Sequence, residues 1–279
     1  MKKIYFMGGL PRSGSTLLTC LLNQNPTIFA SHASEVLTIM NKYKYMIADF
    51  EVVKLGLMTE NYFSVYRDIP QSFYKNETKP IIIDKNRGWG APYSLEIAND
   101  FTDNIKIIYV YRPILEVLAS YIQLLNKNPK TNHIDLEIRN QDFLTQYYRP
   151  IDDVRCDYLM RPNSVIDTAL LALGVALKEE YKHLFHVVNY DDLVTNTQET
   201  LSGIYNFLGI DDYTHDLENL ESYWNSEDAN VFGLPGLHEV RSQIKKESVP
   251  PERVLSNYVM EKYKNITKNM GMNEPLFLS

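Results

Sequence analysis

The N-terminal part of the chain contains residues that could bind a phosphate group. The segment Gly9-Leu-Pro-Arg-Ser-Gly-Ser-Thr16 matches the P-loop pattern G-x-x-x-x-G-K-[ST] at every fixed position except one, because Ser15 replaces the lysine. In such a loop, successive backbone N–H groups surround a phosphate, and the next helix points the positive end of its dipole at it. Ser13, Gly14, Ser15 and Thr16 are therefore candidate phosphate ligands.

The missing lysine leaves this loop without its usual ammonium group, and Arg12 is the candidate replacement cation. A kinase or nucleoside triphosphatase also needs a carboxylate near a strand end to hold Mg²⁺. The predicted strand at 105–111 is followed by Arg112, but Asp84 does end a strand. An atypical P-loop kinase therefore stays an alternative, and so does a glycine-rich turn that binds nothing.

Short strands alternate with helices around this loop. A strand is predicted at 3–7, and leucines at helical spacing predict a helix that ends before Pro26. The other predicted strands lie at 81–83, 105–111 and 186–190, and the other predicted helices at 35–58, 113–125, 164–184, 196–209 and 251–268. This alternation predicts one α/β domain over 1–279, with a mostly parallel central sheet flanked by helices. Residues 126–163 are polar and proline-interrupted, which indicates an excursion near the substrate site or a surface insertion.

Arg112 and Ser120 form a second candidate phosphate site at another predicted junction between strand and helix. A guanidinium group can bind a phosphate through two hydrogen bonds, and a hydroxyl adds a further donor. Together with the loop, these residues resemble the sulfotransferases that use 3′-phosphoadenosine 5′-phosphosulfate (PAPS). The resemblance implies that the loop binds the 5′-phosphosulfate and that Arg112 and Ser120 bind the 3′-phosphate. It also implies transfer of the sulfuryl group to a hydroxyl acceptor, with release of adenosine 3′,5′-bisphosphate (PAP).

The resemblance looks closest to the tyrosylprotein sulfotransferase branch and extends over most of the chain. It implies that Glu35 is the general base, that Lys85 is an active-site lysine and that Tyr190 lies near the adenine. A C-terminal segment at about 225–250 would cover the cofactor. That segment would supply contacts to the sulfuryl group and the 3′-phosphate from Arg241, Ser242, Lys245 and Lys246.

The sequence also departs from the family pattern. Many small-molecule sulfotransferases have a histidine base shortly after the active-site lysine, whereas Asn86 and Arg87 follow Lys85 here. His32 lies close enough to Glu35 to compete for the role of base. Because a sulfuryl group carries less charge than a phosphoryl group, side-chain cations such as Arg12 can suffice, and no metal is expected.

Each of these residues also has a purely structural interpretation. Arg112 could be a salt-bridged arginine, Glu35 a carboxylate favoured by a helix dipole, Lys85 a surface lysine and Tyr190 a core tyrosine. A nucleotide-binding module without catalysis is thus a third functional class. The acceptor could be a peptide tyrosine, a carbohydrate or a small alcohol, and the segments 41–74 and 126–163 could line its cleft or belong to the core.

Composition limits the remaining possibilities. The 279 residues include 28 Lys and Arg against 35 Asp and Glu, which gives a net charge of −7. This balance disfavours nucleic acids and anionic lipids as partners. Two cysteines cannot build a disulfide scaffold, and no apolar run is long enough to span a membrane. Without a recognisable signal peptide, we expect a cytoplasmic protein, in which the cations named above gather locally around an anionic cofactor.

Overall fold

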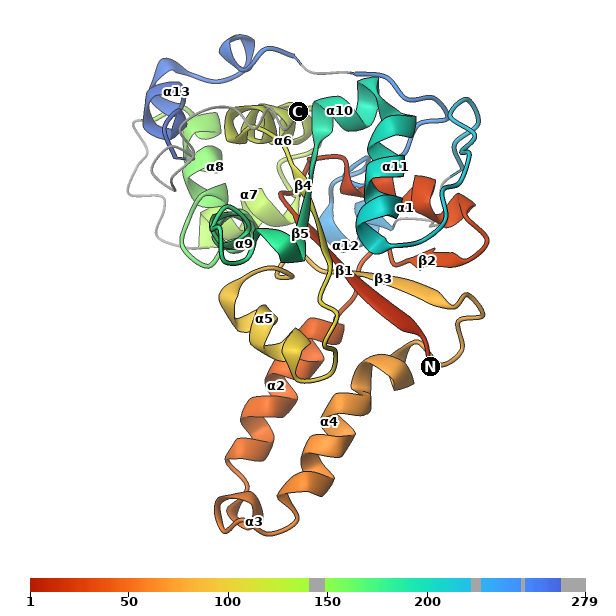
Figure 1. Ribbon diagram of the computed structural model, residues 1–279. Helices are drawn as coiled ribbons and strands as arrows, with labels where there is room; N and C mark the ends of the chain where they lie inside the picture. The colour runs from red at the N-terminus through yellow and green to blue at the C-terminus, as the bar shows by residue number, and fades with distance from the viewer. Residues whose placement is uncertain (141–148, 222–226, 247–248, 267–279) are drawn as a thin grey trace.

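Five parallel strands form the central sheet of the computed structural model, which describes residues 1–140, 149–221, 227–246 and 249–266 (Figure 1). The spatial order of the strands is β2-β3-β1-β4-β5. Their bounds are β1 (Lys3–Gly9), β2 (Ile28–Ala30), β3 (Ile81–Lys85), β4 (Ile107–Tyr111) and β5 (Phe185–Asn189). The predicted α/β class and parallel sheet are confirmed, and β2 is a short strand that the sequence did not reveal.

Two hydrophobic cores lie on opposite faces of this sheet because successive side chains of a strand point in opposite directions. In β1, Phe6 belongs to one core, while Tyr5 and Met7 belong to the other. In β4, Tyr109 joins Phe6 on the first face, and Val110 lies on the second. The strands are therefore mainly apolar on both faces, as expected of a parallel sheet covered on both sides, with polar residues such as Asp84 and Lys85 at the end of β3.

Helices cover both faces (Figure 1). The core on the Tyr5 face is closed by α1 (Ser15–Gln24) and α11 (Thr197–Leu208). The opposite core receives side chains from α5 (Pro92–Asn99), α6 (Ile114–Lys127), α7 (His133–Asn140), α8 (Ile151–Leu159) and α9 (Val165–Ala176). The shorter elements are α10 (Tyr190–Thr195), α12 (Asp228–Phe232), α13 (Asn257–Tyr263), η2 (Lys182–Leu184) and η3 (Pro251–Arg253).

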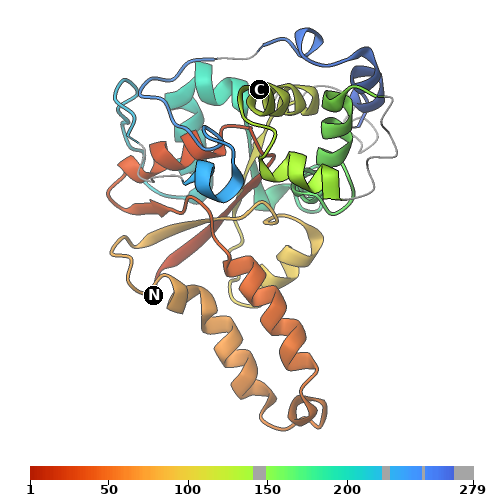
Figure 2. The same ribbon diagram turned by 180° about the vertical axis from the view of Figure 1, so that it is seen from behind.

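The helix predicted at 35–58 is interrupted. It is divided into α2 (Val36–Ala48) and α3 (Glu51–Lys54), because Phe50 between them adopts an extended backbone with ψ of 132°. A further helix, α4 (Thr59–Phe73), runs back toward the sheet. Figures 1 and 2 show α2 and α4 projecting from the body as a hairpin with α3 at its tip.

Other helices also differ from their predicted bounds. The helix predicted at 164–184 ends at Ala176, and the chain then turns through η2 into β5. The region 126–163 contains α7 and α8, and its residues 141–148 lie outside the described residues. The helix predicted near 251–268 consists of η3 and α13, with 267–268 outside the description. Within the described ranges, no helix combines the length and apolar character that crossing a bilayer requires.

Candidate active site

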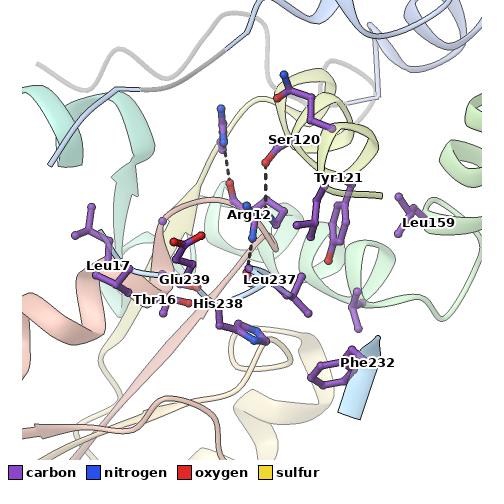
Figure 3. A pocket seen from close by; sticks show the side chains of 18 of the residues that line it. Arg12, Thr16, Leu17, Ser120, Tyr121, Leu159, Phe232, Leu237, His238 and Glu239 are labelled. Carbon is purple, nitrogen blue, oxygen red and sulfur yellow. Dashed lines mark hydrogen bonds between the residues drawn. The ribbon is translucent and has the colours of Figure 1, made fainter. Parts of the chain in front are cut away.

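A cavity of about 670 Å³ lies where β1, β4 and β5 end (Figure 3). Ligand sites of open α/β sheets form at this carboxyl edge of the strands. Most of the cofactor ligands predicted from the sequence line this cavity. They are Arg12, Gly14, Ser15, Thr16, Arg112, Ser120, Tyr190, Arg241 and Lys245. The fold therefore brings together residues that are more than 200 positions apart in the sequence.

The loop between β1 and α1 is shaped by two glycines. Gly9 has φ of 135°, and a Cβ atom there would lie 2.4 Å from the carbonyl oxygen of Val110. Gly14 has φ of 91° at the N-cap of α1, where a Cβ atom would lie 3.0 Å from the ring of Tyr190. Ser13 is fully buried, and its hydroxyl donates to the carbonyl of Leu10 at 2.5 Å, so its side chain braces the loop. The first amides of α1 remain available for an anion.

Arg12 points from this loop into the cavity (Figure 3). Its Nε donates to the hydroxyl of Ser120 at 3.2 Å, and its Nη1 donates to the carbonyl of Leu237. Burial lowers the pKa of Arg12, and the nearby Arg112 and Arg87 lower it further. Both of these acceptors are neutral oxygens, so an incoming anion would find a guanidinium charge that they do not compensate.

Arg112 connects the end of β4 to two other parts of the site. Its Nη1 donates to the carbonyl of Arg12 at 3.0 Å, and its Nε donates to Glu116 at 3.1 Å. Its Cζ lies 4.2 Å from the centre of the Tyr190 ring, at the start of α10. Arg112 is only 5% exposed, so these contacts fix the direction of its guanidinium group.

Lys85 ends β3 and is buried beside the cavity, although it is not one of the lining residues. Burial and the charge of Arg87 lower its pKa to about 7. Its charge in turn lowers the pKa values of His32 and His238, which shows that these side chains share one electrostatic environment. An anion bound nearby would favour the protonated amine.

Arg87 is a site residue that sequence reasoning missed. It lines the cavity, and burial lowers its pKa. Its charge lowers the pKa values of Arg12, Lys85, His32 and His238, which places it among all of them. Among the described residues, no hydrogen bond or ion pair of Arg87 is recorded. In the sequence, an arginine two residues after Lys85 shows only that the family's histidine is absent there.

Glu35 and Ser242 lie outside the set of lining residues. Glu35 is exposed at the N-cap of α2, where its carbonyl accepts from the amide of Ile39 at 2.8 Å. Ser242 is exposed, and its carbonyl accepts from the amide of Leu220 at 2.9 Å. His32, the competing base, is half-buried, and its pKa falls to about 4 through burial and the charge of Lys85.

A second feature missed in the sequence is a pair formed by His238 and Asp228. His238 lines the cavity, and its Nδ1 lies 2.7 Å from Oδ1 of Asp228. The other oxygen of Asp228 accepts from the backbone N–H of His238 at 2.7 Å. The ring of His238 lies edge-on to that of His32, with 5.0 Å between centroids. Asp228 begins the short helix α12 and His238 lies in the loop that follows it, where no periodic pattern in the sequence marks either residue.

Asp84, the carboxylate that a Mg²⁺-dependent kinase would need, is buried and hydrogen-bonded inside the protein. It is fully buried and accepts from Nε1 of Trp89 at 2.5 Å and from the hydroxyl of Tyr74. Burial raises the pKa of Asp84, which favours its neutral form. Among the described residues, no cluster of three or more His, Cys, Asp or Glu side chains is arranged to hold a metal.

Residues of α7 and α8 line another part of the cavity. Tyr158 and Leu159 of α8 line it together with Ile134 and Glu137 of α7. Arg161 packs over the ring of Tyr158 at 3.5 Å and pairs with Glu137 at 3.4 Å. The tyrosine-rich segment 41–74 contributes no lining residue to this cavity and forms the projecting hairpin instead.

The fold is similar to that of solved sulfotransferases. One similar structure is a sulfotransferase domain from the curacin biosynthetic pathway, with 18% identity, a TM-score of 0.50, and coverage of 99% of this chain and 94% of that one. Another is the sulfotransferase domain of the Synechococcus PCC 7002 olefin synthase, with 18% identity, a TM-score of 0.52, and coverage of 99% and 98%. Among curated protein sequences, none matches this chain. The sulfotransferase domain family matches residues 3–265, and the chain therefore belongs to that family.

Proposed function

We propose that this protein transfers the sulfuryl group of PAPS to a hydroxyl acceptor and releases PAP. The observation that carries the proposal is the meeting of the two sequence motifs in one cavity: Arg12 of the loop donates to Ser120, and Arg112 donates to the carbonyl of Arg12. A bisphosphorylated nucleotide needs two such anion sites at a fixed separation. PAPS supplies the activated sulfuryl group, and the protein supplies the groups that bind and orient it.

The residues present fit an anionic cofactor. Arg12 and Arg87 are cations whose pKa values are lowered by burial, and neither forms an ion pair among the described residues. At the 5′ side, the amides that begin α1 would act together with Arg12 and Lys85. At the 3′ side, the ligands would be Arg112, Ser120, Arg241 and Lys245, with Tyr190 near the adenine.

The same charges would serve the chemistry. Lys85 in its protonated form would stabilise negative charge that develops on the departing oxygen, and Arg12 with the loop amides would stabilise the non-bridging oxygens. Losing one such donor typically costs about 10²–10³ in rate. Ser242 would assist only if the segment that carries it moved toward the cavity. The proton of the acceptor would pass to Glu35 or to a histidine that reaches the cavity.

The acceptor is proposed to be a hydroxyl compound: a peptide tyrosine, as in the tyrosylprotein branch, a carbohydrate or a small alcohol. The wall formed by Tyr158, Leu159 and Ile134 offers apolar area beside the charged ligands. Such a wall suits the carbon skeleton of an acceptor, while Glu137 and Arg161 provide polar contacts at its rim.

One experiment separates this function from its alternatives. Calorimetry with PAP is followed by transfer of labelled sulfate from PAPS to a library of acceptors in excess EDTA. We expect PAP binding and EDTA-resistant transfer. Tight binding without transfer would indicate a binding module, and turnover of ATP only in the presence of Mg²⁺ would indicate a kinase.

A further inference from the structure

His238 and Asp228 are arranged as a proton-accepting pair inside the cavity. We propose that His238 removes the proton of the acceptor hydroxyl through Nε2 and that Asp228 is the positioning residue that holds its ring. This assignment rests on the proposed function, since it concerns the same transfer. The base is then a histidine of the C-terminal segment. It replaces the histidine that the loop after β3 lacks, and it takes the role that the resemblance gives to Glu35 at the start of α2.

The geometry fixes which nitrogen acts. Both oxygens of Asp228 hold His238, one at Nδ1 and one at the backbone N–H, each at 2.7 Å. An ionised carboxylate accepts, so Nδ1 carries the hydrogen and Nε2 keeps the lone pair. Among the described residues, no hydrogen bond to Nε2 is recorded, and His238 is one of the lining residues (Figure 3).

The charges around His238 keep it neutral in the free site. Burial lowers its pKa below the ordinary 6.5, and Lys85 and Arg87 lower it further, whereas Asp228 raises it. His32 packs against the ring, and Glu239 is the next residue in the chain and also lines the cavity. A neutral imidazole with an available Nε2 can accept a proton near neutral pH, as a general base must.

The neighbouring residue couples this pair to the cofactor site. The carbonyl of Leu237 accepts from Nη1 of Arg12, so the backbone beside His238 is held by the phosphate-binding loop. In the transfer, the bond from sulfur to the 5′-phosphate oxygen breaks and the bond from sulfur to the acceptor oxygen forms. The acceptor proton moves to Nε2 of His238, and its later release to solvent restores the neutral ring.

Glu35 is less well placed for this role. Its side chain is exposed at the N-cap of α2 and does not line the cavity. Burial and the charge of Lys85 lower the pKa of His32 to about 4, which makes it a weak base near neutral pH. A proton acceptor also benefits from a carboxylate partner that stabilises its protonated form, and Asp228, itself 3% exposed, provides this for His238.

The first test uses nitrogen NMR of labelled histidines in the PAP complex, which needs no turnover. We expect His238 to be a neutral Nδ1–H tautomer at pH 7, with the resonance identified by its loss in His238→Gln. Because Asp228 raises the pKa of His238, Asp228→Asn should lower that pKa. A His238 protonated at Nε2 alone would overturn the assignment.

The second test compares acceptors of different acidity. His238→Gln should lower kcat for phenol, or for an alcohol found in the acceptor screen, by about 10²–10⁴. It should cost much less for 4-nitrophenol above neutral pH, because that acceptor is already ionised. The fall of kcat at acidic pH should vanish in His238→Gln and move to lower pH in Asp228→Asn. His183→Gln, exposed in η2 outside the cavity lining, is the control and should keep wild-type rates.

The outcomes are distinguishable. If wild-type protein binds PAP but transfers sulfate to no acceptor, the proposed function fails, and the proposal about His238 falls with it. If wild-type protein transfers sulfate and His238→Gln loses the same factor with phenol and with 4-nitrophenol, only the assignment of the base is wrong. An unchanged His238→Gln beside an inactive Glu35→Gln would return the role to Glu35.

Discussion

The guanidinium group of Arg112 lies over the ring of Tyr190, with 4.2 Å between Cζ and the ring centre. This contact joins the end of β4 to the start of α10, which follows β5. Glu116, in the first turn of α6, accepts a hydrogen bond from Nε of the same guanidinium at 3.1 Å. Arg112 is thus oriented before any ligand arrives.

Replacing Arg112 should weaken nucleotide binding more than it slows transfer. Arg112→Ala removes a charged hydrogen-bond donor worth about 1.5–3 kcal/mol, so the Kd for PAP should rise by about 10-fold to 150-fold. Ser120→Ala should raise it less. Calorimetry with PAP measures both effects, and Arg139→Ala, exposed in α7 and outside the cavity lining, is the control. If Arg112→Ala binds PAP as the wild type does, the 3′-phosphate site is elsewhere.

Lys85 should take up a proton when PAP binds. Its pKa of about 7 in the free protein leaves it largely neutral at pH 8, and an anion nearby favours the charged form. We expect uptake of up to one proton at pH 8 and almost none at pH 6, where the amine is already protonated. Calorimetry in buffers of different ionisation enthalpy measures this uptake. Lys85→Met should abolish the difference, and Lys106→Met should preserve it.

The same pKa has a consequence for stability. A lysine with a lowered pKa in the folded state binds fewer protons than in the unfolded chain between pH 7 and 10.5. The free energy of unfolding should therefore rise with pH across that window through this group. Lys85→Met removes a buried cation, so it should stabilise the protein most below pH 7, and the gain should shrink toward pH 10. Urea denaturation of the wild type and Lys85→Met at several pH values measures this difference. A gain in stability that is the same at every pH would show that Lys85 does not titrate with a lowered pKa.

Arg87 should lower the free energy of unfolding but raise the rate of transfer. It is a half-buried cation without an ion pair among the described residues, and burial lowers its pKa. Arg87→Met should therefore raise the free energy of unfolding by about 1 kcal/mol or more, which corresponds to a Tm gain of about 2–4 °C. Transfer should fall by about 10²–10³ if the guanidinium stabilises charge on the reacting groups. Thermal unfolding and single-turnover rates measure the two effects, and a variant with lower stability and full activity would contradict both.

A buried arginine, Arg155, joins α7 to α8 in the wall of the cavity. The side chain of Arg155 in α8 is fully buried, and its Nε and Nη2 donate to the two oxygens of Asp135 in α7 at 2.8 and 2.6 Å. Nη1 of Arg155 also pairs with Asp152 at 2.9 Å, so Asp135→Asn leaves the buried guanidinium only partly compensated. The change should therefore cost at most about 3–5 kcal/mol. Replacing both residues with apolar ones should cost less than either single change.

A matched surface pair provides the control for that prediction. Lys182 and Glu179 form an ion pair in which both side chains are more than half exposed. Lys182→Ala should change the free energy of unfolding by about 0.5 kcal/mol or less. Urea denaturation measures the free energy of unfolding of the four variants: the single changes at Asp135 and Arg155, the double change, and Lys182→Ala. A single change at Asp135 as mild as the one at Lys182 would mean that α7 and α8 are held by other contacts.

The local motifs were predictable because each depends on a strand end. Gly14 and Arg12 follow β1, and Arg112 follows β4, so their positions at the edge of a parallel sheet follow from a short stretch of sequence. The resemblance to the family predicts a catalytic role for Glu35, yet its side chain is exposed and lies outside the cavity lining.

The remaining parts of the site depend on long-range packing. His238 reaches the cavity because Asp228 and the carbonyl of Leu237 anchor an irregular segment, and no periodic pattern encodes such contacts. Arg87 required knowledge of its burial, since an arginine after a strand is usually solvated. The break at Phe50, which separates α2 from α3, is likewise a backbone choice that the apolar spacing did not reveal.

The hydrogen bonds of Arg12 and Arg112 also determine how binding would be driven. Arg12 donates to Ser120 and Leu237, and Arg112 donates to the carbonyl of Arg12, so backbone and hydroxyl oxygens already occupy the ligand directions. A phosphate oxygen would replace a neutral acceptor with an anionic one while the guanidinium groups stay in place. The site is therefore preorganised. Little conformational entropy would be lost on binding, and most of the gain would appear as favourable enthalpy.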